Sequence, residues 1–394
     1  MKIELFFIFL CSVILFISYM TYNINLYMGY SLDLKEINSQ KKNYKIEVPT
    51  TINNLIKIKE KYLIACEFKP LDLYINNLYL RNIIENEKIY LINTENEKFS
   101  EIKIKKFPDK IPFHPHGISL FITEQNNYIL YVLNHAVNYD YEGQERVEKF
   151  NIIFEGNSIS LIYDSSIILP DEFFLRVDSI IFLKEDKFIF TTNKAYEIPK
   201  DSDELIDSFT YLYYKMNNIL EIINPFINIK KCFIYLYDKE EISIIDNSQS
   251  ISYRGIAYDN KRKLLYVVKP YEKEINIFEE NNNEFKLIKT ISTLYVGNNI
   301  FYDNKNDIII LGINGKKSEE ETIIKKIKNN NSIENVETYS GYEILNPENN
   351  YSIGDLMLMK KKDFKWINSA VYIKGKIYMS SIYSKGILVY ESDN

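Results

Sequence analysis

The chain has 394 residues, of which 46% are hydrophobic and 26% charged, a composition that supports a buried core and excludes a mainly disordered polymer. Forty-eight Lys and Arg oppose 54 Asp and Glu, giving a formal net charge of −6. Neither sign is clustered into a stripe that could follow a phosphate backbone, so we expect no nucleic acid partner. With three Cys, a disulfide framework or a zinc cluster is excluded.

The N-terminus is a candidate membrane segment. Leu5 to Met20 is a run of sixteen residues without a charge, and continued to Tyr22 it is marginally long enough for a spanning helix, which needs about 20 apolar residues. We expect residues 1–22 to be an uncleaved hydrophobic signal-anchor helix and residues 23–45 a linker. The bulk of the chain would then be membrane-anchored and lumenal or extracellular. The alternatives are a cleaved leader with a secreted product, or a buried helix of the domain.

Two N-glycosylation sequons fit that side of a membrane. They are Asn330-Asn331-Ser332 and Asn350-Tyr351-Ser352, and they predict a glycoprotein, although sequons arise easily by chance in so Asn-rich a chain.

Residues 46–394 read as one all-β domain. Short alternating runs rich in Ile, Tyr, Phe and Val are separated by Asn, Asp, Lys and Glu, which is the period-two signature of strands. Six segments share one plan, a small or polar pair followed by two apolar strands joined by a polar turn, and they cover residues 53–66, 116–135, 177–193, 254–269, 298–313 and 368–381. Repeats of this kind predict a six-bladed β-propeller.

The pair that begins each repeat is the candidate functional column, because the first strand of a propeller blade lines the central channel. In order, the pairs are Asn53/Asn54, His116/Gly117, Val177/Asp178, Arg254/Gly255, Asn298/Asn299 and Asn368/Ser369. Each pair taken alone is equally well explained as a turn, since Asn, Asp and Gly tolerate unusual backbone angles.

Two stretches interrupt the repeats. Residues 201–231 carry apolar residues three and four apart, which predicts a short amphipathic helix inserted as a lid. Residues 315–338 are charged and Asn-rich, and we expect a solvated hairpin or loop there.

The sequence resembles the paraoxonase and arylesterase family. The residues FHPHGISLFI from Phe113 to Ile122, followed by LYVLNH ending at His135, are similar to the family's first-blade signature. The likeness continues with DSIIFL, RGIAYD and VGNNIFYD and closes with AVYIKGKIYMSSIYSKGILVYE. It spans roughly residues 46 to 391 and is weakest across 200 to 250.

The resemblance implies a hydrolase of lactones and aryl esters with two calcium ions in its channel, one structural and one catalytic. His116 and His135 fall on the family's proposed water-activating pair. A neutral imidazole can accept a proton from water at working pH, and a second one can relay it. His114 matches no functional position, and we expect it to be a turn residue before Pro115.

The catalytic calcium ligands are where this chain departs from the resemblance. The matching positions hold Asn53, Val177, Arg254, Asn298 and Asn299, so both of the family's acids are absent. At 4 Å a unit positive charge repels a divalent ion by about 8 kcal/mol for an effective dielectric of about 20. We therefore expect no normal catalytic calcium unless an acid such as Glu67 reaches in.

The resemblance has different consequences for the structural calcium site and for the family's disulfide. The resemblance places the structural ligands at Asn54, Asp178 and the main-chain carbonyl of Ile118, so weak calcium binding and an empty site are both open. The cysteine positions of the disulfide correspond to the region of Asn43 and to Glu391, so closure of the ring should depend on strand pairing. Cys66 and Cys232 are expected to be small buried hydrophobes.

Two functions stay open. In the first, the protein is a membrane-anchored hydrolase that acts on a small ester or lactone with its His pair, and Arg254 with Asn299 binds the oxyanion or substrate. In the second, it is a non-catalytic propeller that binds or scaffolds at a membrane. The loss of calcium ligands favours the second function, and the retained His pair favours the first.

Overall fold

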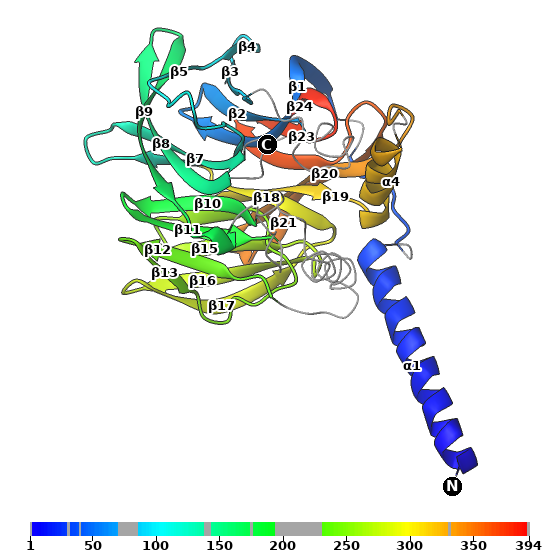
Figure 1. Cartoon of the computed structure of the whole chain (residues 1–394). Coiled ribbons are helices and arrows are strands. Elements are labelled where there is room, and N and C mark those ends of the chain that lie inside the picture. Colours follow the sequence, from blue (N-terminus) through cyan, green and yellow to red (C-terminus); the bar gives the residue numbers. More distant parts are fainter. Residues whose placement is uncertain are drawn as a thin grey trace.

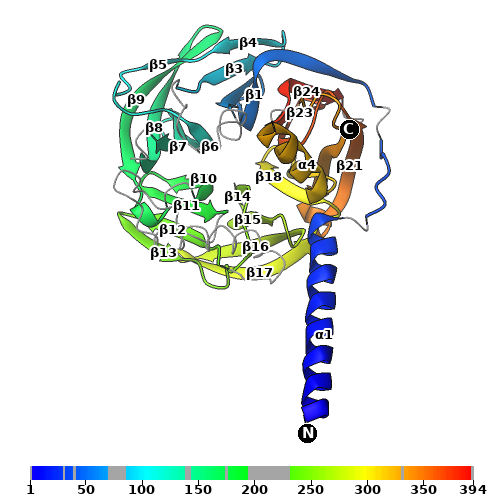
Figure 2. The ribbon, with the colours of Figure 1, turned by 45° about the vertical axis from the view of Figure 1, so that its right-hand side comes forward.

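The protein is a ring of antiparallel β-sheets from which one long helix projects. The computed structural model describes residues 2–29, 32–38, 41–69, 86–137, 143–173, 176–193, 231–329 and 332–391. Figure 1 shows the stacked sheets, and Figure 2, turned by 45°, shows them arranged around a central axis. The predicted all-β propeller arrangement is confirmed.

The projecting helix is α1, Lys2–Met28. Several of its large apolar side chains face solvent, among them Phe9 and Leu15. Among the residues that the structure describes, no helix has the length and apolarity needed to cross a membrane. Anchoring in a membrane therefore stays a prediction.

Four of the sheets are separate blades, each built from strands consecutive in the chain. A five-stranded blade contains β5 Lys103–Lys105, β6 Pro115–Ile122, β7 Tyr128–Val137, β8 Gly143–Glu155 and β9 Ser158–Ile168, and the short η1 Asp171–Phe173 follows it. The next contains β10 Val177–Lys184, β11 Lys187–Thr192, β12 Ile234–Asp238 and β13 Glu241–Ile244. The third contains β14 Ile256–Asp259, β15 Leu264–Lys269, β16 Glu274–Asn281 and β17 Glu284–Ser292. The fourth contains β18 Val296–Asp303, β19 Ile308–Asn314, β20 Thr338–Asn346 and β21 Ser352–Lys361, with η2 Pro347–Asn349 between its last two strands.

The fifth sheet joins the two ends of the domain. Its seven strands run in the order β22 Ile367–Ile373, β23 Lys376–Ser381, β24 Lys385–Glu391, β1 Asn43–Ile58, β2 Tyr62–Phe68, β3 Ile89–Asn93 and β4 Lys98–Glu101. The prediction of six separate blades is therefore wrong: the described strands form four separate blades and one continuous sheet. The cause is the 16-residue length of β1, whose residues 43–46 pair with β24 while residues 51–58 pair with β2.

The innermost strands contact one another in a closed circuit. Going round the axis, β1 contacts β6, β6 contacts β10, β10 contacts β14, β14 contacts β18, β18 contacts β22, and β22 returns to β1. This circuit surrounds the centre of Figure 2. It brings together the starts of strands that lie more than 300 residues apart in the chain, as the hydrogen bond between Asn368 and Asn53 shows.

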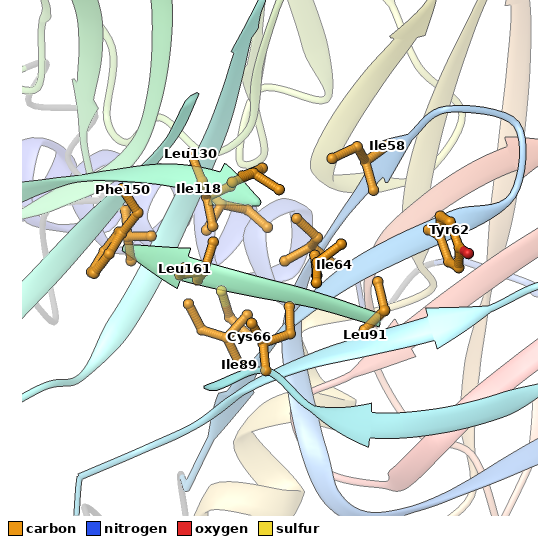
Figure 3. Close-up of a cluster of buried hydrophobic side chains, with 14 of the residues drawn as sticks. Ile58, Tyr62, Ile64, Cys66, Ile89, Leu91, Ile118, Leu130, Phe150 and Leu161 are labelled. Carbon is orange, nitrogen blue, oxygen red and sulfur yellow. The ribbon is translucent and has the colours of Figure 1, made fainter. Parts of the chain in front are cut away.

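Hydrophobic clusters fill the spaces between neighbouring sheets. In Figure 3, Ile58, Ile64 and Leu91 of the seven-stranded sheet meet Ile118 and Leu161 of the five-stranded blade. A second cluster packs the two ends of the seven-stranded sheet against each other. Each fully buried aliphatic side chain contributes about 1.5–3 kcal/mol relative to exposure, so these clusters stabilise the ring and fix the positions of its inner strands.

The two predicted interruptions have different outcomes. The predicted lid at 201–231 lies outside the described residues, apart from residue 231. Residues 315–338, predicted to be a solvated hairpin or loop, contain instead the helix α4, Lys317–Lys328. The prediction was wrong because Ile323 and Ile327 recur four apart on one face and are buried against Trp366 and Tyr383, a helical period hidden among charged residues.

Closure of the ring by strand pairing alone is confirmed. Asn43 pairs with Tyr390 in the β1–β24 ladder, and the Lys42 ammonium lies 3.1 Å from the Glu391 carboxylate. Cys66 and Cys232 are buried, as expected of small hydrophobes. Part of the predicted linker is also bound to the propeller, because Ile37 exchanges backbone hydrogen bonds of 2.8 and 3.0 Å with Leu358.

Candidate active site

Irregular pairing marks the polar pairs on the inner strands. The ladder shifts register between Ile52 and Asn54, between Pro115 and Ile118, between Val177 and Ser179, between Gly297 and Ile300, and between Ile367 and Ser369. Each shift coincides with one of the polar pairs singled out in the sequence. A bulge leaves a residue outside the ladder and turns its side chain in a new direction, so these residues are available for functions other than strand pairing.

Arg254 and Gly255 occupy the corresponding place before β14. The Gly255 amide donates a hydrogen bond to the Asn298 carbonyl, 3.3 Å away. A Cβ added to Gly255 would fall 2.5 Å from the Asn299 Cα and 2.5 Å from the Ile300 nitrogen. Only glycine lets the backbone of Arg254 come this close to β18.

The two histidines of the predicted pair lie side by side. His116 is on β6 and His135 on β7, and their ring centroids are 4.8 Å apart with the planes inclined at 48°. Phe68 packs edge-on to His116, with its ring centroid 6.2 Å away. Pro115 lies opposite Asn134 in the hairpin register. His116 follows Pro115 near the start of β6 and His135 follows Asn134 near the end of β7, so both histidines lie at the same end of the blade.

Each histidine is fixed through its Nδ1 atom. The His116 Nδ1 lies 2.9 Å from the Asp178 carbonyl oxygen, and the His135 Nδ1 lies 2.7 Å from the Glu145 Oε1. A carbonyl or carboxylate oxygen only accepts hydrogen bonds, so Nδ1 carries the hydrogen in both rings. The Nε2 lone pair is therefore the basic atom of each imidazole.

Glu145 is a site residue that the sequence analysis missed. It lies on β8 directly opposite His135 in the ladder, and its carboxylate is buried. A signal was available: His135 and Glu145 are equidistant from residue 140, the midpoint of the polar segment between two apolar strands. Pairing the two strands symmetrically about that midpoint would have placed them together.

Burial keeps His116 in its neutral form. Desolvation, and then repulsion from His135, lowers the pKa of His116 to about 4, although the nearby Asp178 acts in the opposite direction. Arg254 also lowers this pKa, which places its positive charge within electrostatic reach of the imidazole. His116 is thus unprotonated, and able to accept a proton, throughout the neutral range.

Arg254 is the permanent cation of this end of the ring. Burial on its own lowers the pKa of Arg254. The negative charges of Asp178 and Glu320 raise this pKa, and the net shift is upward. Tyr271 and Tyr383 contribute in the same direction. The guanidinium is therefore charged at any working pH.

The predicted calcium ligands are divided between residues that line a channel and residues that do not. Asn54 and Asn299 line a channel of about 730 Å³ together with Ile118, Ser179 and Ser369. This channel continues along the strands to their far ends at Lys184, Asp303 and Lys305. Asn53, Asp178, Asn298 and Arg254 are not among its lining residues, so the predicted column is not one continuous surface.

The buried members of the set are largely occupied by hydrogen bonds within the protein. The Asn53 Oδ1 accepts from the Asn368 Nδ2 at 2.6 Å, and the Asn298 Nδ2 donates to the Ile367 carbonyl at 2.8 Å. Asp178 accepts from the Asn193 Nδ2 at 2.9 Å and from the Ser179 hydroxyl at 3.2 Å. The bonds of Asn53 and Asn298 cross-link inner strands.

The residues present do not fit a resident catalytic calcium ion. Calcium takes six to eight oxygen ligands, whereas this level of the ring offers Val177 and the Arg254 guanidinium beside one carboxylate, Asp178, which is already hydrogen-bonded. Glu67 does not compensate, because it accepts hydrogen bonds from Thr50 and from the Lys88 amide. Within the described ranges, no three or more His, Cys, Asp and Glu side chains gather in one place as ligands of a metal ion could.

His114 has a structural place beside the pair. It lies directly before β6 and is buried, and its amide donates to the Asn134 Oδ1 at 2.7 Å. Its carbonyl accepts from the His135 amide at 3.2 Å. The backbone of His114 thus ties the start of β6 to His135.

The sequence of this chain is similar to those of a known protein family. Residues 82–337, well over half of the chain, match the arylesterase family. Serum paraoxonase/lactonase 3 of Homo sapiens is 26% identical over 231 residues, which cover 58% of this chain and 57% of the human protein. Serum paraoxonase/arylesterase 2 of Bos taurus is 24% identical over 232 residues, which cover 57% of this chain and 56% of the bovine protein. The matched region thus spans less than two thirds of either relative.

Among solved structures, the luciferin-regenerating enzyme aligns with 90% of this chain and 96% of its own, with a TM-score of 0.49 and 8% identity. A likeness at this level supports no inference about function.

Proposed function

Because this chain belongs to the arylesterase family, we propose that it hydrolyses a small carboxylic ester or lactone with a water molecule activated by His116. The observation that carries the proposal is the array of His116, His135 and Glu145, with ring centroids 4.8 Å apart and a 2.7 Å contact from His135 to the carboxylate. Two relatives support the substrate class, since their names include lactonase and arylesterase activities.

The reaction begins with proton transfer from water. The His116 Nε2 accepts the proton while the water oxygen forms a bond to the carbonyl carbon of the ester, and the carbonyl oxygen becomes an oxyanion. His135 takes up the proton from His116, and the buried Glu145 carboxylate stabilises the resulting imidazolium. The tetrahedral intermediate then breaks its bond to the alcohol oxygen, which recovers the proton from His135. The carboxylic acid that remains releases its own proton to solvent and leaves as a carboxylate.

Arg254 supplies the positive charge opposite the developing oxyanion. A fixed hydrogen-bond donor aimed at such an oxyanion lowers the barrier by about 3–4 kcal/mol in other hydrolases. Asn299, on the adjacent strand, is the second candidate for contact with the substrate. A structural calcium ion held by Asn54, Asp178 and the Ile118 carbonyl stays a prediction, and no step above depends on it.

The proposed location is the outer or lumenal side of a membrane, with the apolar run from Leu5 to Met20 as the anchor. The length of that run and the sequon at Asn350, an exposed residue, support this location. Recovery of the protein in the membrane fraction after alkaline carbonate washing is expected. Recovery in the soluble fraction would show instead that the leader does not anchor it.

The function is tested with phenyl acetate and a simple aryl lactone as substrates of the full chain. His116→Gln removes the base and is expected to lower kcat/KM at least about 100-fold. His114→Gln, in the same segment but outside the pair, is the matched control and should retain activity, with thermal melting used to verify that both variants are folded. Wild-type turnover that is absent, or equal to that of His116→Gln, would overturn the proposal and favour a non-catalytic binding propeller.

A further inference from the structure

Arg254 is held in place from both sides by backbone hydrogen bonds. Its amide donates to the Val268 carbonyl at 3.1 Å, and its carbonyl accepts from the Thr191 hydroxyl at 3.1 Å. Its neighbours Tyr253 and Gly255 are buried, whereas Arg254 is only half-buried. The side chain therefore extends from a rigid backbone and is accessible to a ligand.

The acids near Arg254 have other partners. Asp178 accepts hydrogen bonds from Asn193 and Ser179, and Glu320, in the first turn of α4, is ion-paired with Lys317. Among the described residues, none accepts a hydrogen bond from the Arg254 guanidinium. Its attraction to Asp178 and Glu320 is thus electrostatic and at a distance, and within the part of the chain that the structure describes its five N–H donors have no acceptor.

A guanidinium with unused donors matches one ligand group in particular. The planar fork of Arg makes two parallel hydrogen bonds to a carboxylate, and such charge-assisted pairs are about twice as strong as neutral hydrogen bonds. The surroundings therefore favour an anion bound by Arg254 rather than by a metal ion.

We propose that Arg254 forms a metal-independent carboxylate-binding site at the His116 end of the propeller. The ligand class is an organic monocarboxylate with an apolar or aromatic body, since the aromatic ring of Phe68 packs against His116 at this end of the propeller. This inference deepens the proposed function, because a carboxylate of this class is the acid product of aryl ester hydrolysis. The product would then compete with substrate for Arg254.

The site is tested by titrating the full chain with benzoate in the presence of a chelator. Benzamide, which has the same shape without the charge, is the ligand control. We expect benzoate to bind at least about tenfold more tightly than benzamide, with the same affinity whether the chelator or calcium is present. Equal affinity for the two ligands, or benzoate binding that disappears with chelator and returns with calcium, would overturn the proposal.

Variants assign the binding to Arg254. Arg254→Gln should weaken benzoate at least about tenfold, and Arg254→Lys should restore part of the affinity because it keeps the charge but loses the fork. Lys305→Gln is the matched control, since it removes one positive charge from the opposite mouth of the channel and should leave benzoate binding unchanged. Unaltered binding by Arg254→Gln would contradict the assignment. If that variant does not fold, the comparison of benzoate with benzamide on the wild-type protein decides whether the carboxylate site exists.

The proposed hydrolase function and the proposed carboxylate site can be contradicted independently of each other. Binding of benzoate through Arg254 without turnover of phenyl acetate would support the anion site and contradict the hydrolase function. Hydrolysis of phenyl acetate without a difference in affinity between benzoate and benzamide would support the hydrolase function and contradict the anion site.

Discussion

At the scale of single residues, the arrangement around His135 differs from an isolated histidine pair. The two Nδ1 atoms are each fixed by an oxygen, one from a main-chain carbonyl and one from the Glu145 carboxylate. The carbonyl of Asp178 is neutral, whereas Glu145 brings a buried negative charge. At His116, burial and repulsion from His135 lower the pKa to about 4.

Glu145 is accordingly predicted to act as a positioning residue for His135. Glu145→Gln keeps a hydrogen-bond acceptor but removes the negative charge that stabilises an imidazolium, so kcat/KM should fall by about 10- to 100-fold. The acid limb of the pH–rate profile should move to lower pH, a change that a purely structural residue would not cause. The profile is measured beside Glu155→Gln, an exposed change on the same strand. A fall in rate with an unshifted profile would contradict this role.

At the scale of elements, the inner strands combine regular pairing with a bulge at the start of most of them. The regular part is built from buried Ile, Leu and Val and is stabilised by the clusters between sheets. The bulged part turns polar side chains away from the ladder. The strands therefore act as a scaffold along most of their length and carry functional groups only at one end.

Gly255 is the residue on which the close approach of β14 and β18 depends. In Gly255→Ala the new Cβ would lie 2.5 Å from backbone atoms of Asn299 and Ile300, so the two strands must separate. We expect a loss of about 2–3 kcal/mol in the free energy of unfolding, measured by denaturant titration.

Gly354→Ala is the comparison for that change. The atom nearest its added Cβ is the Nδ2 of the Asn346 side chain, and Gly354 is exposed, so the side chain can move and the loss should stay below about 1 kcal/mol. Similar losses at the two positions would show that the approach of β14 to β18 is not tightly constrained.

At the scale of the whole molecule, stability comes from apolar packing around the ring and includes one unpaired acid. Glu343 on β20 is fully buried, and neither of its carboxyl oxygens has a hydrogen-bond partner among the described residues. Burial raises the pKa of Glu343 from 4.5 to about 7. The folded protein therefore prefers this side chain protonated, and ionising it costs folding free energy.

Stability is predicted to fall as pH rises from about 5 to 8. In that range the unfolded chain has already released the Glu343 proton while the folded chain still holds it, so the free energy of unfolding declines with pH and the decline ends above the folded pKa of about 7. Glu343→Gln should remove about 2–3 kcal/mol of this decline, measured by denaturant titration at both pH values. Glu348→Gln, an exposed change on the same blade, should keep the wild-type decline, and an unchanged decline in Glu343→Gln would refute the assignment.

The sequence alone determined the all-β class, the repeated strand pairs and the polar residues that begin the repeats, and its resemblance to the family paired His116 with His135. These features depend on local patterns, namely alternation of apolar residues and a hairpin, which a reader of the chain can follow residue by residue. It also identified the substitution of Arg254 for a calcium ligand. Glu145 could have been found in the same way, from the register of one hairpin.

Only the tertiary structure decided the remaining features. One strand, β1, belongs to both ends of the ring because residues 43–46 and 51–58 meet strands far apart in sequence, and no local pattern encodes that joint pairing. The helix α4 depends on burial of Ile323 and Ile327 by Trp366, and the division of the asparagines between a channel and a buried network depends on bulges. In each case the deciding contacts join residues distant in the chain, whose energies become available only when the ring closes.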